Sequence, residues 1–172
     1  IHPNEKHSTP LLEAIGESDI IWRGQGTSQV SYDQLKLAYD SGCKEMAVGV
    51  ETVDGNVMKI INKGWQTEKQ ILEFVSNAKK IGIKIKMCLI FGLPGEKDNI
   101  AEKTIEFIEK NDIDYVNVSG FAPMPGSPIF KDLKRYGIKY VDHDWSKHAH
   151  LLYRFSNDES VGLPFEYEKE NK

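Results

Sequence analysis

The 172-residue sequence predicts an α/β fold, a partial (βα) barrel of about four parallel strands with crossover helices. Apolar segments that suit buried strands alternate with amphipathic segments that suit helices. The strand-like segments start near residues 19, 45, 83 and 114, so successive starts lie 26, 38 and 31 residues apart, as in βα units. A complete eight-stranded barrel needs about 250 residues, so four such units form only part of one, or a small open sheet.

The apolar segments are short, as buried parallel strands are. They cover residues 19–23, 45–50, 83–91 and 115–119.

Helical patterns fill the intervals between these strands. Residues 31–34 and 67–70 are both capping boxes, in which Ser or Thr precedes Gln by three positions, and they open helices that end at Gly42 and Gly82. A shorter helix is expected over residues 54–62. A last helix follows residues 94–95, and its expected inner face consists of Ile100, Thr104, Ile105 and Ile108.

The regular alternation fades after residue 130. We therefore divide the chain into residues 1–130, the partial barrel, and residues 131–172, a C-terminal extension whose last ten or so residues read as a polar tail.

Composition excludes several classes of protein. A hydrophobic content of 40% and a net charge of −4 are ordinary for one globular domain with a core. The chain is mildly acidic, whereas nucleic acids and anionic membranes favour clustered Lys and Arg, so we expect neither as a partner. No apolar stretch approaches the roughly 20 residues that span a bilayer. The chain starts with neither Met nor a signal peptide, so we expect a piece of a longer polypeptide.

The chain has two cysteines, Cys43 and Cys88. Two thiols cannot complete a four-thiolate zinc site or the three-thiolate CxxxCxxC motif of an iron–sulfur cluster. No disulfide pattern is present, so a reducing cytoplasm is the expected location. Cys88 lies inside an apolar run and is expected in the core.

No other catalytic motif stands out. The sequence has no nucleophile elbow, Walker loop or Ser–His–Asp pattern. Histidines near Trp145 lack metal-ligand spacing, so we expect no metal site and interpret them as surface or hydrogen-bonded side chains. They are His143, His148 and His150.

Three strand-like segments run into turns with polar or conformationally special residues, at 49–52, 89–96 and 123–127. Ligands of parallel α/β proteins bind at the carboxyl ends of the strands. We therefore predict one shared ligand site at these three ends.

Each segment also has a simpler interpretation. Glu51 could accept two hydrogen bonds from a ribose diol, or it could cap the next helix or pair with a lysine. Gln25 offers a donor and an acceptor between two glycines. The backbone around Gly92 could pack against a ligand or form an ordinary strand-to-helix turn. Residues 121–128, with three prolines, could present apolar surface to an aromatic base or act as a stiff connector.

Taken together, these segments resemble the C-terminal half of a radical S-adenosylmethionine (radical SAM) core. The closest likeness is to the class that often carries an N-terminal cobalamin-binding domain, including anaerobic magnesium-protoporphyrin IX monomethyl ester oxidative cyclases. The matching segments are residues 49–52 with 62–64, then 90–96, then 123–127, and Trp22 with Gln25 fits the preceding strand.

In that family a partial barrel holds a [4Fe–4S] cluster and S-adenosylmethionine (SAM), whose cleavage gives a 5′-deoxyadenosyl radical. The resemblance implies that Glu51 binds the ribose hydroxyls, with Gln25 nearby. It also implies that cobalamin could take part in the parent protein. The adenine would lie between two backbone stretches, Ile90 with Gly92 on one side and Phe121 with Pro123 on the other.

The family's CxxxCxxC motif and its Gly-Gly-Glu segment are absent, and both belong to a region that would precede Ile1. The chain thus resembles strands three to six of the parent enzyme, and we expect it to be catalytically incomplete without its upstream part. Its expected partners are that part, a small-molecule substrate and, through the open edge near residues 20–23, a second copy.

Two other interpretations stay open. One is a stand-alone half-barrel module that binds a nucleotide or a protein without catalysis. The other is a small aldolase-type barrel, which is disfavoured because no lysine or metal triad stands at the predicted strand ends.

Overall fold

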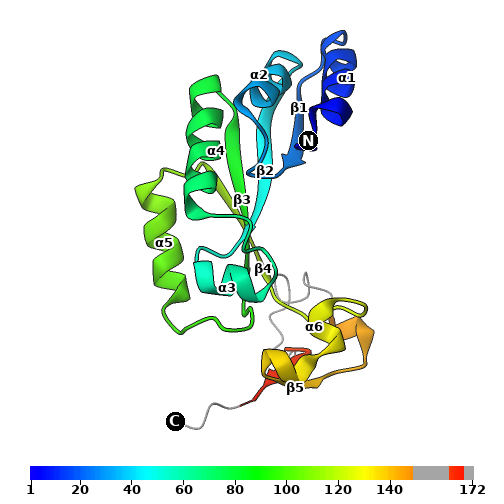
Figure 1. Cartoon of the computed structure of the whole chain (residues 1–172), viewed down its shortest axis with the longest axis vertical. Coiled ribbons are helices and arrows are strands. Elements are labelled where there is room, and N and C mark those ends of the chain that lie inside the picture. Colours follow the sequence, from blue (N-terminus) through cyan, green and yellow to red (C-terminus); the bar gives the residue numbers. More distant parts are fainter. Residues whose placement is uncertain (149–162, 169–172) are drawn as a thin grey trace.

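The computed structural model describes residues 1–148 and 163–168. Its centre is a parallel four-stranded sheet in the order β1-β2-β3-β4, which confirms the predicted fold class (Figure 1). The strands are β1 (Trp22–Gly26), β2 (Cys43–Glu51), β3 (Lys84–Phe91) and β4 (Tyr115–Gly120).

β1 begins later than predicted. The predicted range 19–23 includes Ile20 and Ile21, whose side chains are 50% and 79% exposed. The strand instead continues through Gly24 and Gly26, beyond the predicted end at residue 23, and it pairs in parallel with β2 as far as Gly26. A Cβ on Gly26 would lie 2.9 Å from the Met46 sulfur, so glycine allows the backbone to pack closely there.

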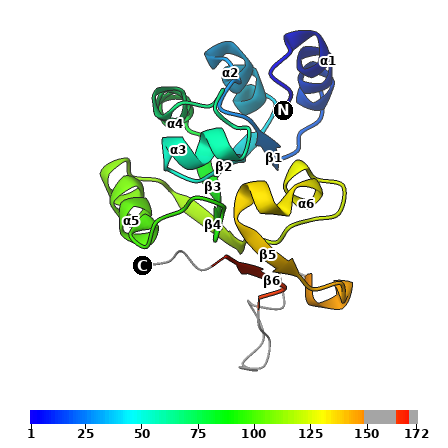
Figure 2. The ribbon, with the colours of Figure 1, turned by 60° about the horizontal axis from the view of Figure 1, so that its bottom comes forward.

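The principal helices line one side of the sheet (Figure 2). They are α1 (Glu5–Gly16), α2 (Tyr32–Asp40), α3 (Gly55–Ile60), α4 (Glu68–Ile81) and α5 (Ile100–Lys110). Both predicted capping boxes are present, at Ser31 and Thr67, and Gly82 ends α4 in the left-handed conformation. No pattern in the sequence predicted α1, which Asn4 caps and which contains Pro10.

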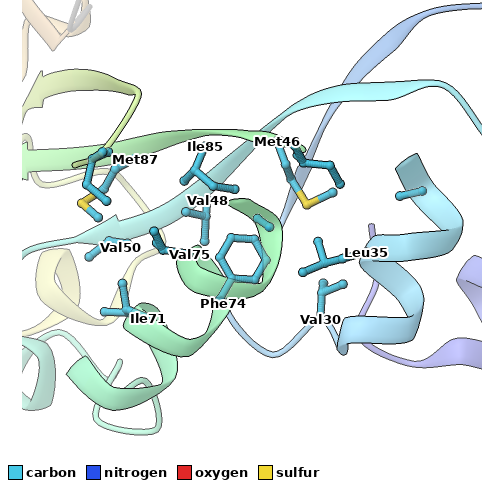
Figure 3. Close-up of a cluster of buried hydrophobic side chains, with 14 of the residues drawn as sticks. Val30, Leu35, Met46, Val48, Val50, Ile71, Phe74, Val75, Ile85 and Met87 are labelled. Atoms are coloured by element: carbon cyan, nitrogen blue, oxygen red, sulfur yellow. The ribbon is translucent and has the colours of Figure 1, made fainter. Parts of the chain in front are cut away.

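The core lies between the sheet and the helices. Alternate residues of β2 and β3 point toward α2 and α4, because side chains along a strand alternate between its two faces (Figure 3). Phe74 of α4 packs among them and is fully buried. The sheet contributes Met46, Val48, Val50, Ile85 and Met87, and the helices contribute Leu35, Ile71 and Val75.

The inner face of α5 differs from the prediction at one position. Thr104 is buried and Ile108 packs against the core, whereas the Ile105 side chain is 56% exposed. Phe107 takes the inner position, since residues 104, 107 and 108 share one face of a 3.6-residue helix and residue 105 lies beside it.

The extension forms a small unit beyond the carboxyl ends of the strands (Figures 1 and 2). It follows α6 (Pro128–Lys131) and contains 3-10 turns at Leu133–Tyr136 and Trp145–His148 and an antiparallel pair, β5 (Ile138–Val141) with β6 (Phe165–Tyr167). Phe165 is buried, so the expected polar tail is wrong for residues 165–167.

A second hydrophobic cluster joins this unit to the strand ends. Its buried members are Val57, Leu93, Phe121, Ile138, Val141 and Phe165. Within the described residues, none of the helices is both long and apolar enough to cross a bilayer.

Candidate ligand site at the strand ends

A pocket of about 530 Å³ opens at the carboxyl ends of β2, β3 and β4. Its walls are mostly apolar, which suits a planar organic ligand. The apolar side chains come from Ile61, Ile90, Leu93, Phe121, Ala122, Met124 and Ile129. The polar and charged side chains are those of Glu51, Lys63, Ser119, Ser127 and His148.

Three of the six predicted site residues, Glu51, Ile90 and Phe121, line this pocket. They come together because β2, β3 and β4 are adjacent and parallel, with Glu51 beside Leu89 and Phe91 beside Gly120.

The other three predicted residues do not line the pocket. Gly92 lies in the turn that directly follows β3. Pro123 is buried, although Ala122 and Met124 on either side of it are lining residues. Gln25 lies exposed in β1, and its carbonyl oxygen accepts a hydrogen bond from the amino group of Ile1.

Glu51 adopts an unusual backbone conformation. Its φ angle is 68°, in the left-handed region, where the register between β2 and β3 shifts. Strain of this kind costs about 1–3 kcal/mol and persists only where the surroundings enforce it. The shift brings the carboxylate to the pocket wall, where Oε1 accepts a hydrogen bond from Lys63 Nζ at 3.0 Å.

Gly49 makes room for this ion pair. A Cβ at that position would lie 2.6 Å from Glu51 Oε1, closer than real Cβ atoms approach. Its carbonyl oxygen also accepts a hydrogen bond from Lys63 Nζ at 2.7 Å. Glu51 therefore pairs with a lysine, Lys63, which was the simpler interpretation of this residue. Both side chains are only 23% exposed, and both line the pocket.

The turn after β3 is fixed by two side chains. The Glu96 carboxylate accepts a hydrogen bond from the Gly92 N–H at 2.6 Å, and the Tyr167 hydroxyl donates to the Gly92 carbonyl oxygen at 2.8 Å. Burial raises the pKa of the Glu96 carboxyl group. Burial, together with the Glu96 charge, also raises the pKa of Tyr167, which keeps its phenol protonated as a donor.

Sequence reasoning did not assign a role to two lining residues, Lys63 and His148. Lys63 belongs to the segment 62–64 that carried the family resemblance, and that was its only signal. His148 is buried, with Nε2 2.6 Å from the carbonyl oxygen of Asp142. It was expected at the surface or in a hydrogen bond, and the structure shows the second arrangement. Within the described residues no group of His, Cys, Asp and Glu could hold a metal ion, and His150 lies outside them.

Cys88 is another correction, because it is partly exposed rather than in the core. It shares with Lys86 and Ile90 the face of β3 opposite the buried residues Met87 and Leu89. Burial still raises the pKa of its thiol.

Comparison with known proteins identifies the family. The sequence pattern of the radical SAM superfamily matches residues 16–108, which is more than half of the chain. The protein therefore belongs to the radical SAM superfamily, whose cofactors are SAM and a [4Fe–4S] cluster.

Related sequences include several methyltransferases. Bacteriochlorophyllide d C-12(1)-methyltransferase of Chlorobaculum tepidum is 29% identical over 153 residues, which are 87% of this chain and 33% of that protein. Hopanoid C-2 methylase of Rhodopseudomonas palustris is 26% identical over 129 residues, or 75% of this chain and 24% of that protein. The chain thus spans a third or less of the length of these relatives.

Solved structures share the fold. Coproporphyrinogen III oxidase of Escherichia coli superimposes with a TM-score of 0.63 at 19% identity, covering 81% of this chain and 39% of that one. The radical SAM methyltransferase TsrM of Kitasatospora setae was solved with cobalamin and a [4Fe–4S] cluster. It superimposes with a TM-score of 0.59 at 18% identity, covering 67% of this chain and 25% of that one. These likenesses confirm a partial radical SAM barrel.

Proposed function

We propose that this chain forms the ribose- and adenine-binding side of the SAM site in a radical SAM enzyme of methyltransferase type. The observation that carries the proposal is the convergence of Glu51, Ile90 and Phe121 on one pocket. A carboxylate at the end of one strand, beside apolar walls from the next two strands, is complementary to a nucleoside with a diol and a flat base.

The ion pair with Lys63 leaves Glu51 able to bind a diol. Lys63 engages Oε1, and a carboxylate has about four acceptor positions, so oxygen lone pairs remain for two ribose hydroxyls. Lys63 also neutralises the charge, which lowers the cost of keeping a partly buried carboxylate beside an apolar wall.

The residues of this chain do not fit the cluster. A radical SAM cluster needs three thiolates, and the two cysteines stand apart, Cys43 buried at the start of β2 and Cys88 on β3. When bound, the cluster supplies the electron that cleaves SAM. We therefore propose that its ligands come from another part of the polypeptide, and that the 172 residues alone are inactive.

The methyltransferase assignment rests on the named relatives, and cobalamin use is proposed from the cobalamin-bound TsrM structure. Oxidative cyclisation, the reaction of the cyclases that the sequence resembles, is the alternative reaction for the parent enzyme. A binding module without catalysis is the alternative for the chain.

Calorimetric titration of the chain with SAM and with 5′-methylthioadenosine tests the proposal. We expect saturable binding that Glu51→Gln weakens roughly tenfold or more, since hydrogen bonds to a charged group are lost. Glu45→Gln is the matched control, because Glu45 is 22% exposed and paired with Lys86 at the other end of β2. Absence of binding to either nucleoside, or equal loss in both variants, would contradict the proposal.

A further inference from the structure

We propose that His148 contacts the bound nucleoside and that its Nδ1 accepts a hydrogen bond from the exocyclic amine of the base. His148 would then select a 6-aminopurine over a 6-oxopurine. This inference rests on the proposed function and assigns a specificity-determining residue to the same pocket.

The hydrogen bond at the other ring nitrogen fixes the tautomer. Nε2 lies 2.6 Å from the carbonyl oxygen of Asp142. A carbonyl oxygen can only accept, so Nε2 carries the hydrogen, and in the neutral ring Nδ1 presents a lone pair.

That lone pair has no partner. Nδ1 is buried, makes no hydrogen bond within the part of the chain that the structure describes, and belongs to a side chain that is 7% exposed and lines the pocket. Buried polar atoms are almost always hydrogen-bonded, so an unpartnered acceptor on a residue that lines a pocket points to a donor on the ligand.

Neighbouring rings hold the imidazole in place. The Trp145 ring packs on it with centroids 4.9 Å apart, and Phe130 packs on Trp145 at 5.9 Å. The acceptor is therefore presented by a supported aromatic group rather than by a free side chain.

The chemistry of adenosine supplies one donor for this acceptor. Its donors are the ribose hydroxyls and the 6-amino group, and the proposed function assigns the hydroxyls to Glu51. The amine is the donor that remains. A 6-oxopurine would place a carbonyl oxygen against the lone pair of Nδ1, and two acceptors would face each other without a hydrogen.

The test compares 5′-methylthioadenosine with 5′-methylthioinosine in the wild-type chain, His148→Gln and His148→Asn. Gln reaches the position of Nε2 and can keep the bond to Asp142, but it has no acceptor at Nδ1. Asn can place an oxygen near Nδ1. We expect the wild type to prefer the adenosine compound roughly tenfold or more, His148→Gln to lose most of that preference and His148→Asn to keep part of it.

His143→Gln is the control variant, because His143 contacts the same Trp145 ring, at 5.7 Å, without lining the pocket. Its preference should match the wild type. Histidine ¹⁵N spectra of the wild type give a readout that requires no variant to fold. The adenosine compound should shift the Nδ1 resonance of His148 and leave its Nε2 resonance in the protonated range.

The outcomes separate this inference from the proposed function. Binding of methylthioadenosine with no preference over the inosine compound, with a preference that survives His148→Gln, or with an unshifted Nδ1 resonance overturns the role of His148 and leaves the nucleoside site standing. Failure of the wild type to bind either SAM or methylthioadenosine overturns both.

Discussion

The Tyr167 hydroxyl donates a hydrogen bond to the carbonyl oxygen of Gly92 at 2.8 Å, although 75 residues separate the two positions. This contact ties β6 of the extension to the turn that follows β3. The extension therefore supports the wall of the pocket at Ile90 and Leu93 from behind.

Tyr167→Phe should lower the free energy of unfolding by about 1 kcal/mol, because the Gly92 carbonyl loses its side-chain donor while the ring keeps its packing. Urea denaturation measures the change. Tyr140→Phe is the control, since the Tyr140 side chain is 52% exposed on β5. Equal stability of the two variants would show that the contact contributes nothing.

Glu96 gives the fold a specific pH dependence. Burial raises the pKa of its carboxyl group in the folded state, so the native protein binds more protons than the unfolded chain at pH values just above the ordinary carboxyl pKa. This contribution to stability is fully present below the unfolded pKa and is lost as the pH rises through the folded pKa.

Glu96→Gln should remove this dependence and can keep the hydrogen bond from the Gly92 N–H through its amide oxygen. As the pH rises from the unfolded to the folded pKa of Glu96, the free energy of unfolding of the variant should therefore increase relative to that of the wild type. Glu102→Gln, at an exposed position of α5, serves as the control. A constant difference between the Glu96 variant and the wild type would contradict the assignment.

Gly49→Ala should disrupt the Glu51–Lys63 pair, because the new methyl group would lie 2.6 Å from Glu51 Oε1. We expect weaker binding of methylthioadenosine, by roughly tenfold, with the helical content unchanged in circular dichroism. Gly55→Ala is matched to it, because a Cβ there meets nothing within 4 Å. If Gly49→Ala binds the nucleoside as tightly as Gly55→Ala does, the carboxylate is not a ribose ligand.

Anaerobic treatment of the chain with iron and sulfide should produce no [4Fe–4S] cluster bound at stoichiometry. Two cysteines in separate places cannot supply three thiolates. Visible absorption and iron content after desalting measure the result. A stable cluster on the isolated chain would show that our division of the active site is wrong.

β1 stands at one edge of the sheet, beside the exposed Ile20 and Ile21. We propose that this edge pairs with another strand and, in the isolated chain, with a second copy. Light scattering over a range of concentrations should show dimers that Ile21→Lys reduces. A monomer at every concentration would count against edge pairing.

Local signals predicted most of the barrel. β2, β3 and β4 came from apolar runs, and α2 and α4 from capping boxes, because each signal lies within a few residues of the element it specifies. The predicted first strand stopped at residue 23, before two glycines that are unfavourable inside a strand, although pairing with β2 extends β1 through them.

The structure of the extension and half of the pocket's residues could not be predicted, because they depend on contacts between segments that are far apart in the sequence. β6 has three residues and forms because β5 and the strand ends lie beside it. His148 lines the pocket only because the 3-10 turn at Trp145–His148 places it there. Gln25 was predicted from its place at a strand end, yet it lies outside the pocket that adjacent strands form.

One nucleoside should bind between β3 and the segment after β4, with its ribose at Glu51. Intermolecular nuclear Overhauser effects between methylthioadenosine and the labelled chain measure this placement. We expect the adenine protons to contact both the Ile90 methyl groups and the Phe121 ring. Contacts confined to other surfaces, or to only one of these two walls, would contradict it.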